Sequence, residues 1–242
     1  MSFFHRLWYR SSLSPLVLLA FVAPLSAQTL PLAAPLTSLL SPEGGALLHN
    51  SEAHADYLPL TSHFVTQENQ AFCGIASMVM VLNAIGIPAP EAPVWSRQYF
   101  TQSNVFNDHT EAIIPQSLIA RQGLTLAELG GILATYPVEV EVLYGGDLSV
   151  NEFRQALVEN LAEGENFVLI NYLRLAIGQE RGGHISPIAA YDEDTDQFLI
   201  LDVSRYKYPP VWVGAELLWE ATNTIDSVSG KTRGVVLVNT VE

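Results

Sequence analysis

The chain has 242 residues, of which 49% are hydrophobic, so it can form the core of one large domain or of two small ones. This composition excludes an intrinsically disordered protein. The sequence carries 25 acidic and 11 basic residues, a formal net charge of −14. Because phosphate groups are bound by clustered Lys and Arg, this charge also argues against nucleic acid and anionic membranes as partners.

The first 27 residues have the pattern of a secretory signal peptide. A basic flank precedes an apolar run over residues 13–25, and the small pair Ser26-Ala27 marks a cleavage site. The apolar run is short and interrupted by proline, and no other segment approaches the roughly 18 apolar residues of a membrane helix. We therefore expect an exported domain of residues 28–242, periplasmic or extracellular, without stable membrane insertion.

The segment after the predicted cleavage site is expected to begin with an extended stretch up to about residue 40. A short helix is then predicted to begin at Ser41-Pro42-Glu43, because serine is a good helix cap and proline is tolerated in the first turn. Three histidines follow, His49, His54 and His63. Their spacing does not match a zinc motif, so we expect surface histidines and no metal site.

The second half of the chain changes from helices to strands. A helix is predicted over residues 115–121, ending before Gly123, and capping boxes that begin at Thr125 and Ser149 predict two more. Apolar and alternating runs predict strands over residues 138–142, 167–173, 185–191, 198–203 and 233–238, with a short helix over 215–221. Helices followed by mainly antiparallel strands are typical of the α+β class, and the alternation of a doubly wound sheet is missing.

The only cysteine of the chain, Cys73, stands where an apolar helical run begins. The residues that follow are uncharged up to Gly86 and Pro88, which predicts a buried helix with Cys73 at its N-terminus. Free N–H groups and the helix dipole favour a thiolate there. An exported protein with one cysteine forms no internal disulfide, so this thiol is either a small buried hydrophobe or a group kept for chemistry.

A nucleophilic cysteine needs a base, and the base needs an orienting acceptor. The polar turn at residues 192–196 separates two strand patterns, and a turn centred on Glu193 places His184 opposite Asp202. A turn centred one residue later leaves them diagonal neighbours on the same face of the sheet. An aspartate within an apolar strand is costly to bury unpaired, so His184 is its natural partner. The pair is either a structural contact within the sheet or, together with Cys73, a catalytic triad.

Gln67 precedes Cys73 by six residues. A side-chain amide that enters just ahead of the nucleophile helix can donate to the oxygen of a tetrahedral intermediate, with the backbone N–H of Cys73 as the second donor. The alternative is an ordinary loop glutamine.

Four blocks of the sequence resemble the phytochelatin synthase family, within the papain-like cysteine peptidase superfamily. They are Gln67-x-x-Gln70-Ala-Phe-Cys73-Gly-Ile-Ala-Ser-x-x-x-Val-Leu-Asn83, Gly182-Gly-His184-Ile-Ser-Pro-Ile-Ala-Ala-Tyr191, Leu201-Asp-Val-Ser-Arg-Tyr-Lys-Tyr-Pro-Pro-Val-Trp212 and Lys231-Thr-Arg-Gly234. The chain looks like a short, bacterial-type form with the catalytic domain alone. The resemblance implies a papain-like α+β fold: a nucleophile helix and a helical lobe packed on a mainly antiparallel sheet that carries the histidine and the aspartate.

The same resemblance implies γ-glutamylcysteinyl transfer from glutathione. Cys73 would attack the cysteinyl–glycine amide, His184 would carry the proton to the departing glycine, Asp202 would orient the imidazole and Gln67 would complete the oxyanion hole. The thioester would pass to water, giving γ-glutamylcysteine, or to a second glutathione, giving phytochelatin. Since this chain lacks the cysteine-rich C-terminal region of the eukaryotic enzymes, we expect hydrolysis to dominate.

The family's head-group site implies an arginine and an acidic residue around the γ-glutamyl end of glutathione, and the matching residues are Arg233 and Asp226. Such a pair suits a zwitterion, which needs one charge of each sign. Arg181 and Gly183, beside His184, are further candidates. No cofactor is expected, although heavy-metal ions such as Cd or Zn could stimulate synthesis as glutathione thiolates.

Two other functions remain open from the sequence. The chain could be an exported papain-like peptidase acting on peptides, which substrates without a γ-linkage would reveal. It could instead be a thiol or metal-binding module of the cell envelope, which would take up metal without turnover. Trp212 and Trp219 could belong to a core or to a homodimer interface.

Overall fold

The computed structural model describes residues 29–94 and 96–241. The predicted signal peptide, residues 1–27, lies outside this part of the chain. Among the described residues, no helix combines the length and the apolar character that crossing a membrane requires.

A seven-stranded sheet forms the centre of the described chain, with every neighbouring pair of strands antiparallel. Its strand order is β1-β6-β5-β4-β3-β7-β2. The bounds are β1 Thr37–Ser38, β2 Val138–Tyr144, β3 Asn166–Leu173, β4 Gly183–Asp192, β5 Gln197–Ile200, β6 Val211–Gly214 and β7 Gly234–Thr240. The predicted α+β class with a mainly antiparallel sheet is confirmed.

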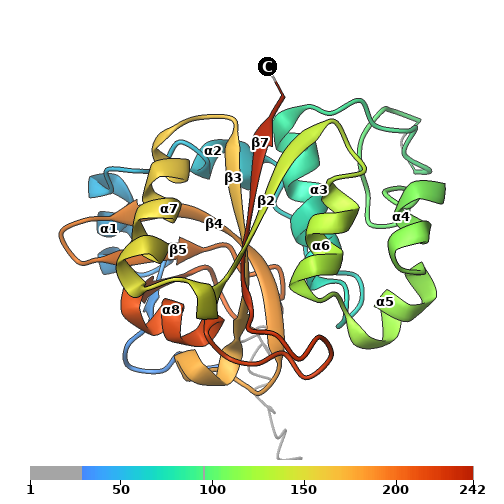
Figure 1. Cartoon of the computed structure of the whole chain (residues 1–242). Helices are drawn as coiled ribbons and strands as arrows, with labels where there is room; N and C mark the ends of the chain where they lie inside the picture. Colours follow the sequence, from blue (N-terminus) through green and yellow to red (C-terminus); the bar gives the residue numbers. More distant parts are fainter. Residues whose placement is uncertain (1–28, 95, 242) are drawn as a thin grey trace, which may run out of the picture.

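Helices cover both faces of this sheet. The bounds are α1 Pro42–Asn50, α2 Tyr57–Ser62, α3 Cys73–Ile85, α4 Asp108–Ile113, α5 Gln116–Gln122, α6 Leu126–Leu133, α7 Val150–Ala162 and α8 Ala215–Thr222, with 3-10 turns η1 Gly145–Asp147 and η2 Arg174–Ile177. Figure 1 shows α3 and α6 on one side of the central strands and α7 and α8 on the other. The lobe of α3 to α6 is the predicted helical lobe.

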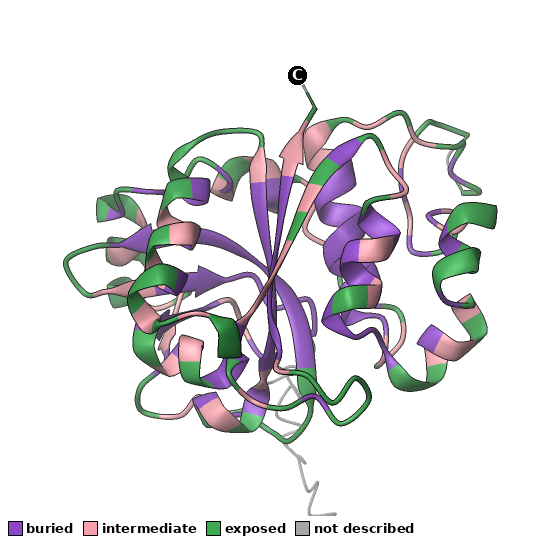
Figure 2. Ribbon diagram, viewed as in Figure 1, coloured by how far each residue is buried: buried purple, intermediate pink, exposed green. Residues whose placement is uncertain are grey.

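Two separate apolar clusters explain why the central strands are apolar on both faces. Phe167 and Leu169 of β3 pack with α3 and α6, whereas Val168 and Ile170 pack with α7 and α8. Side chains alternate along a strand, so covering both faces requires a nearly continuous apolar run. Figure 2 shows these strands buried between the two layers.

Most predicted helix boundaries are found, because they follow from local capping. Ser41 caps α1, and the capping boxes at Thr125 and Ser149 open α6 and α7. Among the helices and strands, four were not predicted: α2, α4, which Asn107 opens with a third capping box, and the short strands β1 and β6. Trp212 of β6 is fully buried and donates to the carbonyl of Gly44 at 3.0 Å, so it belongs to the core.

Asp56, just before α2, is an unusual feature of the core. Its side chain is completely buried, and neither carboxyl oxygen has a hydrogen-bond partner among the described residues. Burial raises the pKa of this carboxyl from 3.8 to about 8. The folded protein therefore holds a proton that the unfolded chain has already released above pH 4.

We expect Asp56 to lower stability progressively as the pH rises. Its folded-state pKa is raised, so the stability linked to this proton is present below about pH 4 and is lost as the pH approaches 8. Asp56→Asn removes this loss, and its gain in unfolding free energy over the wild type should grow from pH 5 to pH 8 by on the order of a few kcal/mol. Denaturant unfolding at both pH values measures it, with the exposed Asp194→Asn as control; a gain that does not depend on pH would contradict the assignment.

Candidate active site

Cys73 is the first residue of α3, as the sequence predicted. The first ten residues of this helix are buried, and it ends at Gly86, which has the left-handed φ of 80° typical of a glycine cap. Cys73 is 8% exposed and lines a cavity of about 400 Å³. The hydroxyl of Ser77 donates to the carbonyls of Cys73 and Ile185, which ties the start of α3 to β4.

His184 lies on β4 and Asp202 just beyond the end of β5. Their side chains meet as predicted, with His184 Nε2 2.9 Å from Asp202 Oδ1. The register centred on Glu193 is wrong, whereas the pairing of Ile188 with Ile200 near the site corresponds to a centre at residue 194, the alternative in which the two side chains are diagonal neighbours. Tyr191 pairs with Phe198 and Asp192 with Gln197, so the turn is centred between residues 194 and 195, and the register shifts between residues 188 and 190. The irregularity and the end of β5 bring the two side chains together without direct strand pairing.

The other side of the His184 ring faces the thiol. Since Nε2 is occupied by Asp202 and by the hydroxyl of Ser186 at 3.0 Å, Nδ1 is the nitrogen left for the hydrogen bond between His184 and Cys73. The Tyr172 ring packs edge-on against the imidazole, with ring centroids 5.7 Å apart. The lone thiol, the imidazole and the carboxylate therefore form one chain of contacts.

The electrostatics favour a thiolate next to an imidazolium. Burial raises the pKa of the Cys73 thiol, but the hydrogen bond and the charge of His184 outweigh burial, and the net pKa is lowered. Burial and the charge of Arg174 lower the pKa of His184, but the Asp202 carboxylate and the hydrogen bond to Cys73 outweigh them, and the net pKa is raised. For Asp202, burial opposes ionisation, yet His184 and Arg174 hold its pKa well below the ordinary range.

Arg174, in the 3-10 turn after β3, is a residue of this site that the sequence did not predict. Its guanidinium binds Asp202 through two hydrogen bonds, Nη1 to Oδ2 at 2.8 Å and Nη2 to Oδ1 at 2.9 Å. Both side chains are almost completely buried. An arginine between apolar residues was the available signal, because a buried charge needs a partner.

Gln67 lies next to this group. Its side chain is buried, its Oε1 accepts from the hydroxyl of Ser204 at 2.6 Å, and its Nε2 donates to the carbonyl of Asn69 at 2.8 Å. Ser204 N–H donates in turn to Asp202 Oδ1 at 2.8 Å. Gln67 is thus fixed beside the triad, and one proton of its amide remains for another acceptor.

The far end of the cavity carries opposite charges. Arg233, which precedes β7, lies 3.9 Å from Asp226 and donates through Nη1 to Asn171 Oδ1 at 2.9 Å. Its buried Nε has no acceptor among the described residues.

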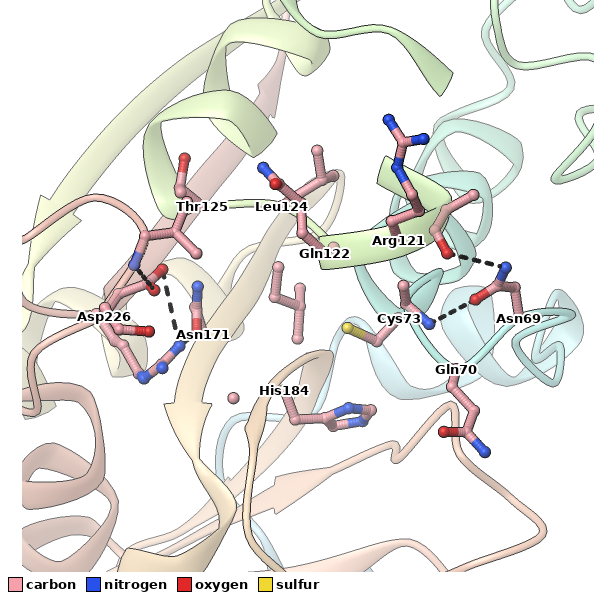
Figure 3. A pocket seen from close by; sticks show the side chains of 18 residues that line it. Asn69, Gln70, Cys73, Arg121, Gln122, Leu124, Thr125, Asn171, His184 and Asp226 are labelled. Atoms are coloured by element: carbon pink, nitrogen blue, oxygen red, sulfur yellow. Dashed lines mark hydrogen bonds and ion pairs between the residues drawn. The ribbon is translucent and has the colours of Figure 1, made fainter. Parts of the chain in front are cut away.

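Figure 3 shows Asp226 and Asn171 on one side of Cys73 and His184, with Asn69, Gln70 and Arg121 toward the other side. Asn171 was not anticipated from the sequence.

The two remaining candidates differ in position. Gly183 lines the cavity, and a Cβ at this position would collide with the guanidinium of Arg233, so glycine is needed for this close approach. Arg181 is exposed and is not part of the cavity lining. Among the described residues, no group of three or more His, Cys, Asp or Glu side chains has the arrangement of a metal site.

The family model for phytochelatin synthase matches residues 27–235 of this sequence. The chain belongs to the phytochelatin synthase family. The four blocks that carried the resemblance meet around the cavity, since they supply Cys73, His184 with Gly183, Asp202 and Arg233.

Relatives of known name support the phytochelatin synthase assignment. The sequence is 31% identical over 208 residues to glutathione gamma-glutamylcysteinyltransferase 3 of Lotus japonicus, covering 85% of this chain and 42% of that protein. It is 34% identical over 180 residues to transferase 1 of the same plant, covering 74% and 35%. A transferase of Schizosaccharomyces pombe is 30% identical, with 76% and 43% covered. The chain thus spans about two fifths of the length of these relatives.

Among solved structures, a fragment of prointerpain A from Prevotella intermedia aligns with a TM-score of 0.42 at 11% identity, covering 79% of this chain and 71% of that one. Xylellain, a cysteine protease from Xylella fastidiosa, aligns with a TM-score of 0.36 at 10% identity, covering 89% and 88%.

Proposed function

We propose that this member of the phytochelatin synthase family is a γ-glutamylcysteinyltransferase that cleaves the cysteinyl–glycine amide of glutathione. One observation supports this most strongly. The single thiol of the chain, at the start of a buried helix, touches the His184–Asp202 pair and shares a cavity with the Arg233–Asp226 pair. Nucleophile, base and zwitterion site are therefore parts of one cavity.

In the first step, Cys73 Sγ attacks the carbonyl carbon of the amide. The backbone N–H of Cys73 and the Gln67 amide would stabilise the oxyanion. Imidazolium Nδ1 of His184 then gives its proton to the glycine nitrogen as the C–N bond breaks. The products are free glycine and a γ-glutamylcysteinyl thioester on Cys73, with His184 neutral again.

In the second step, neutral His184 takes a proton from the acceptor as it attacks the thioester. With water the product is γ-glutamylcysteine, and with the thiol of a second glutathione the first product is a thioester of the two. Transfer to an amine of a second glutathione gives the longer phytochelatin peptide. In each case Cys73 leaves as the thiolate that begins the cycle.

The head group would be held by charge complementarity. The α-carboxylate of the γ-glutamyl residue would bind Arg233, whose Nε donor has no protein acceptor among the described residues, and the ammonium would bind Asp226. Gly183 leaves space for the guanidinium. Arg181, exposed outside the lining, is not included in this site.

The γ-linkage separates this function from that of a general peptidase. We expect glycine release from glutathione to be at least about 100-fold faster, in kcat/KM, than from the tripeptide Glu-Cys-Gly with an ordinary α-linkage, because only the γ-linkage leaves the ammonium and the carboxylate on the same carbon, where Arg233 and Asp226 would bind them. Amino-acid analysis of the released glycine measures both rates. Equal rates would favour the peptidase.

Three further proposals come from the sequence alone. Export after cleavage near Ala27 would be tested by N-terminal sequencing of the mature protein from the host cell. Stimulation by Cd or Zn, entering as glutathione thiolates with the substrate, would be tested by adding the ions to the glycine-release assay. A homodimer would be tested by light scattering.

A further inference from the structure

Four ionisable side chains are buried together next to the cavity. Cys73, His184, Asp202 and Arg174 are 8%, 4%, 0% and 4% exposed. In the state ready for attack, the thiol and the aspartate are negative, and the imidazole and the guanidinium are positive. The net charge of the buried group is therefore zero.

Without Arg174 this balance would fail. A thiolate and an imidazolium form a neutral pair, and papain-like proteases complete it with a neutral asparagine. An aspartate at this position adds a second negative charge in a place where water cannot solvate it, and an uncompensated buried charge is strongly unfavourable. The excess negative charge would also favour the protonated thiol.

We propose that Arg174 is a positioning residue that allows an aspartate, in place of a neutral amide, to orient His184 in this site. Arg174 touches neither the substrate site nor the thiol, and it would act through Asp202. The effect on catalysis rests on the proposed function. The effect on the pKa of the Cys73 thiol does not depend on it.

The geometry fits a positioning role. The two guanidinium nitrogens fix both oxygens of Asp202, which sets the plane of the carboxylate. With that plane fixed, Oδ1 accepts from His184 Nε2, so the proton is held on Nε2 and Nδ1 points to Cys73. A lysine in place of Arg174 would keep the charge but lose this bidentate geometry.

The surroundings hold the guanidinium in place. Nη1 also donates to Gln179 Oε1, and the guanidinium lies over the Tyr208 ring, 5.2 Å from its centre. Tyr208 accepts a hydrogen bond from Glu180 N–H, and Lys207 binds the Glu180 carboxylate at 2.9 Å. The turn that carries Arg174 is thereby joined to the loop that follows Asp202.

The other ionisable groups that face this cluster are two tyrosines and Arg233, which lines the same cavity as Cys73 and interacts with its charge. Tyr172 of β3 packs against His184, and Tyr208 packs against Arg174. Burial raises the pKa of Tyr172 far above the physiological range, so it remains neutral. The pH response of the cluster therefore comes from Cys73 and His184.

The experiment is a double-mutant cycle of charge-removing variants, measured through the reactivity of the Cys73 thiol. Because the chain has one cysteine, the rate of alkylation by iodoacetamide reports on Cys73 alone. Its dependence on pH is measured for the wild type, Arg174→Gln, Asp202→Asn, the double variant and Arg174→Lys. Glycine release from glutathione is measured on the same samples, and thermal unfolding shows which variants are folded.

The two single variants should shift the acid limb of the alkylation profile in opposite directions. Arg174→Gln leaves an extra negative charge and moves the limb up by about one pH unit, whereas Asp202→Asn leaves an extra positive charge and moves it down by a similar amount. The double variant is neutral again, so its limb returns to within about half a unit of the wild type. Arg174→Lys should keep the limb in place while lowering kcat/KM.

A matched control is available at the surface. Arg154 binds Asp196 through two hydrogen bonds of 2.7 and 2.8 Å, and both side chains are partly exposed. Arg154→Gln should leave the alkylation profile unchanged. Shifts of Arg174→Gln and Asp202→Asn in the same direction, or a double variant that stays shifted, would overturn the proposal, as would a limb that Arg174→Lys moves as far as Arg174→Gln. The opposite shifts without any glycine release would retain it and reject the glutathione activity instead.

Discussion

Replacing Cys73 by serine is expected to lower glycine release from glutathione by at least about 10⁴-fold. The hydrogen bond and the charge of His184 lower the pKa of the thiol, whereas a serine hydroxyl is far harder to ionise. Intact-mass spectrometry of the wild type mixed with glutathione should show a γ-glutamylcysteinyl adduct on residue 73. Neither Cys73→Ser nor Cys73→Ala should form this thioester.

The controls for this prediction use the histidines. His184→Ala should lose activity to a similar extent, because it removes the proton carrier, while the exposed His49→Ala should keep wild-type rates. Circular dichroism establishes that each variant is folded. Glycine release that persists in Cys73→Ala would rule out the nucleophile.

The second large effect is expected at the head-group site. Arg233→Gln should reduce kcat/KM for glutathione by about 100-fold, mainly through KM, because the α-carboxylate loses a charged hydrogen-bond donor in a partly buried place. Initial rates of glycine release over a range of glutathione concentrations separate the two constants.

Arg181→Gln is the matched control, because Arg181 is also an arginine close to His184 but lies exposed outside the cavity. It should change kcat/KM less than about threefold, the scale of a surface charge. An equal loss in both variants would place the effect in the overall charge of the protein and not in the head-group site.

The sequence predicted the parts of this site that depend on local signals. Cys73 was placed correctly because Gly86 and the uncharged run before it define a helix without tertiary information. The contact between His184 and Asp202 was predicted as well, and near the site the pairing follows the second of the two predicted registers. The register shift between residues 188 and 190 was not predicted, because it leaves no mark in the alternation.

The features that the sequence did not predict are contacts between distant segments and the absence of hydrogen-bond partners. Arg174 and Asp202 are 28 residues apart and meet only because two turns lie side by side. The Asp56 carboxyl group has no hydrogen-bond partner among the described residues, and no pattern of residues in the sequence indicates that. Seen in the sequence, Asp56 was one more acidic residue among surface histidines.

The adjacency of Gly183 and His184 on β4 has a consequence for which donors fit. One residue contacts the guanidinium of Arg233 and the next contacts the nucleophile, and their Cα atoms are about 3.8 Å apart in any trans peptide. Pairing with β3 holds this spacing rigid. In the proposed function, this strand would fix the distance between the site of the γ-glutamyl α-carboxylate and the thiol, so we expect a β-aspartyl analogue, one methylene shorter, to release glycine more slowly.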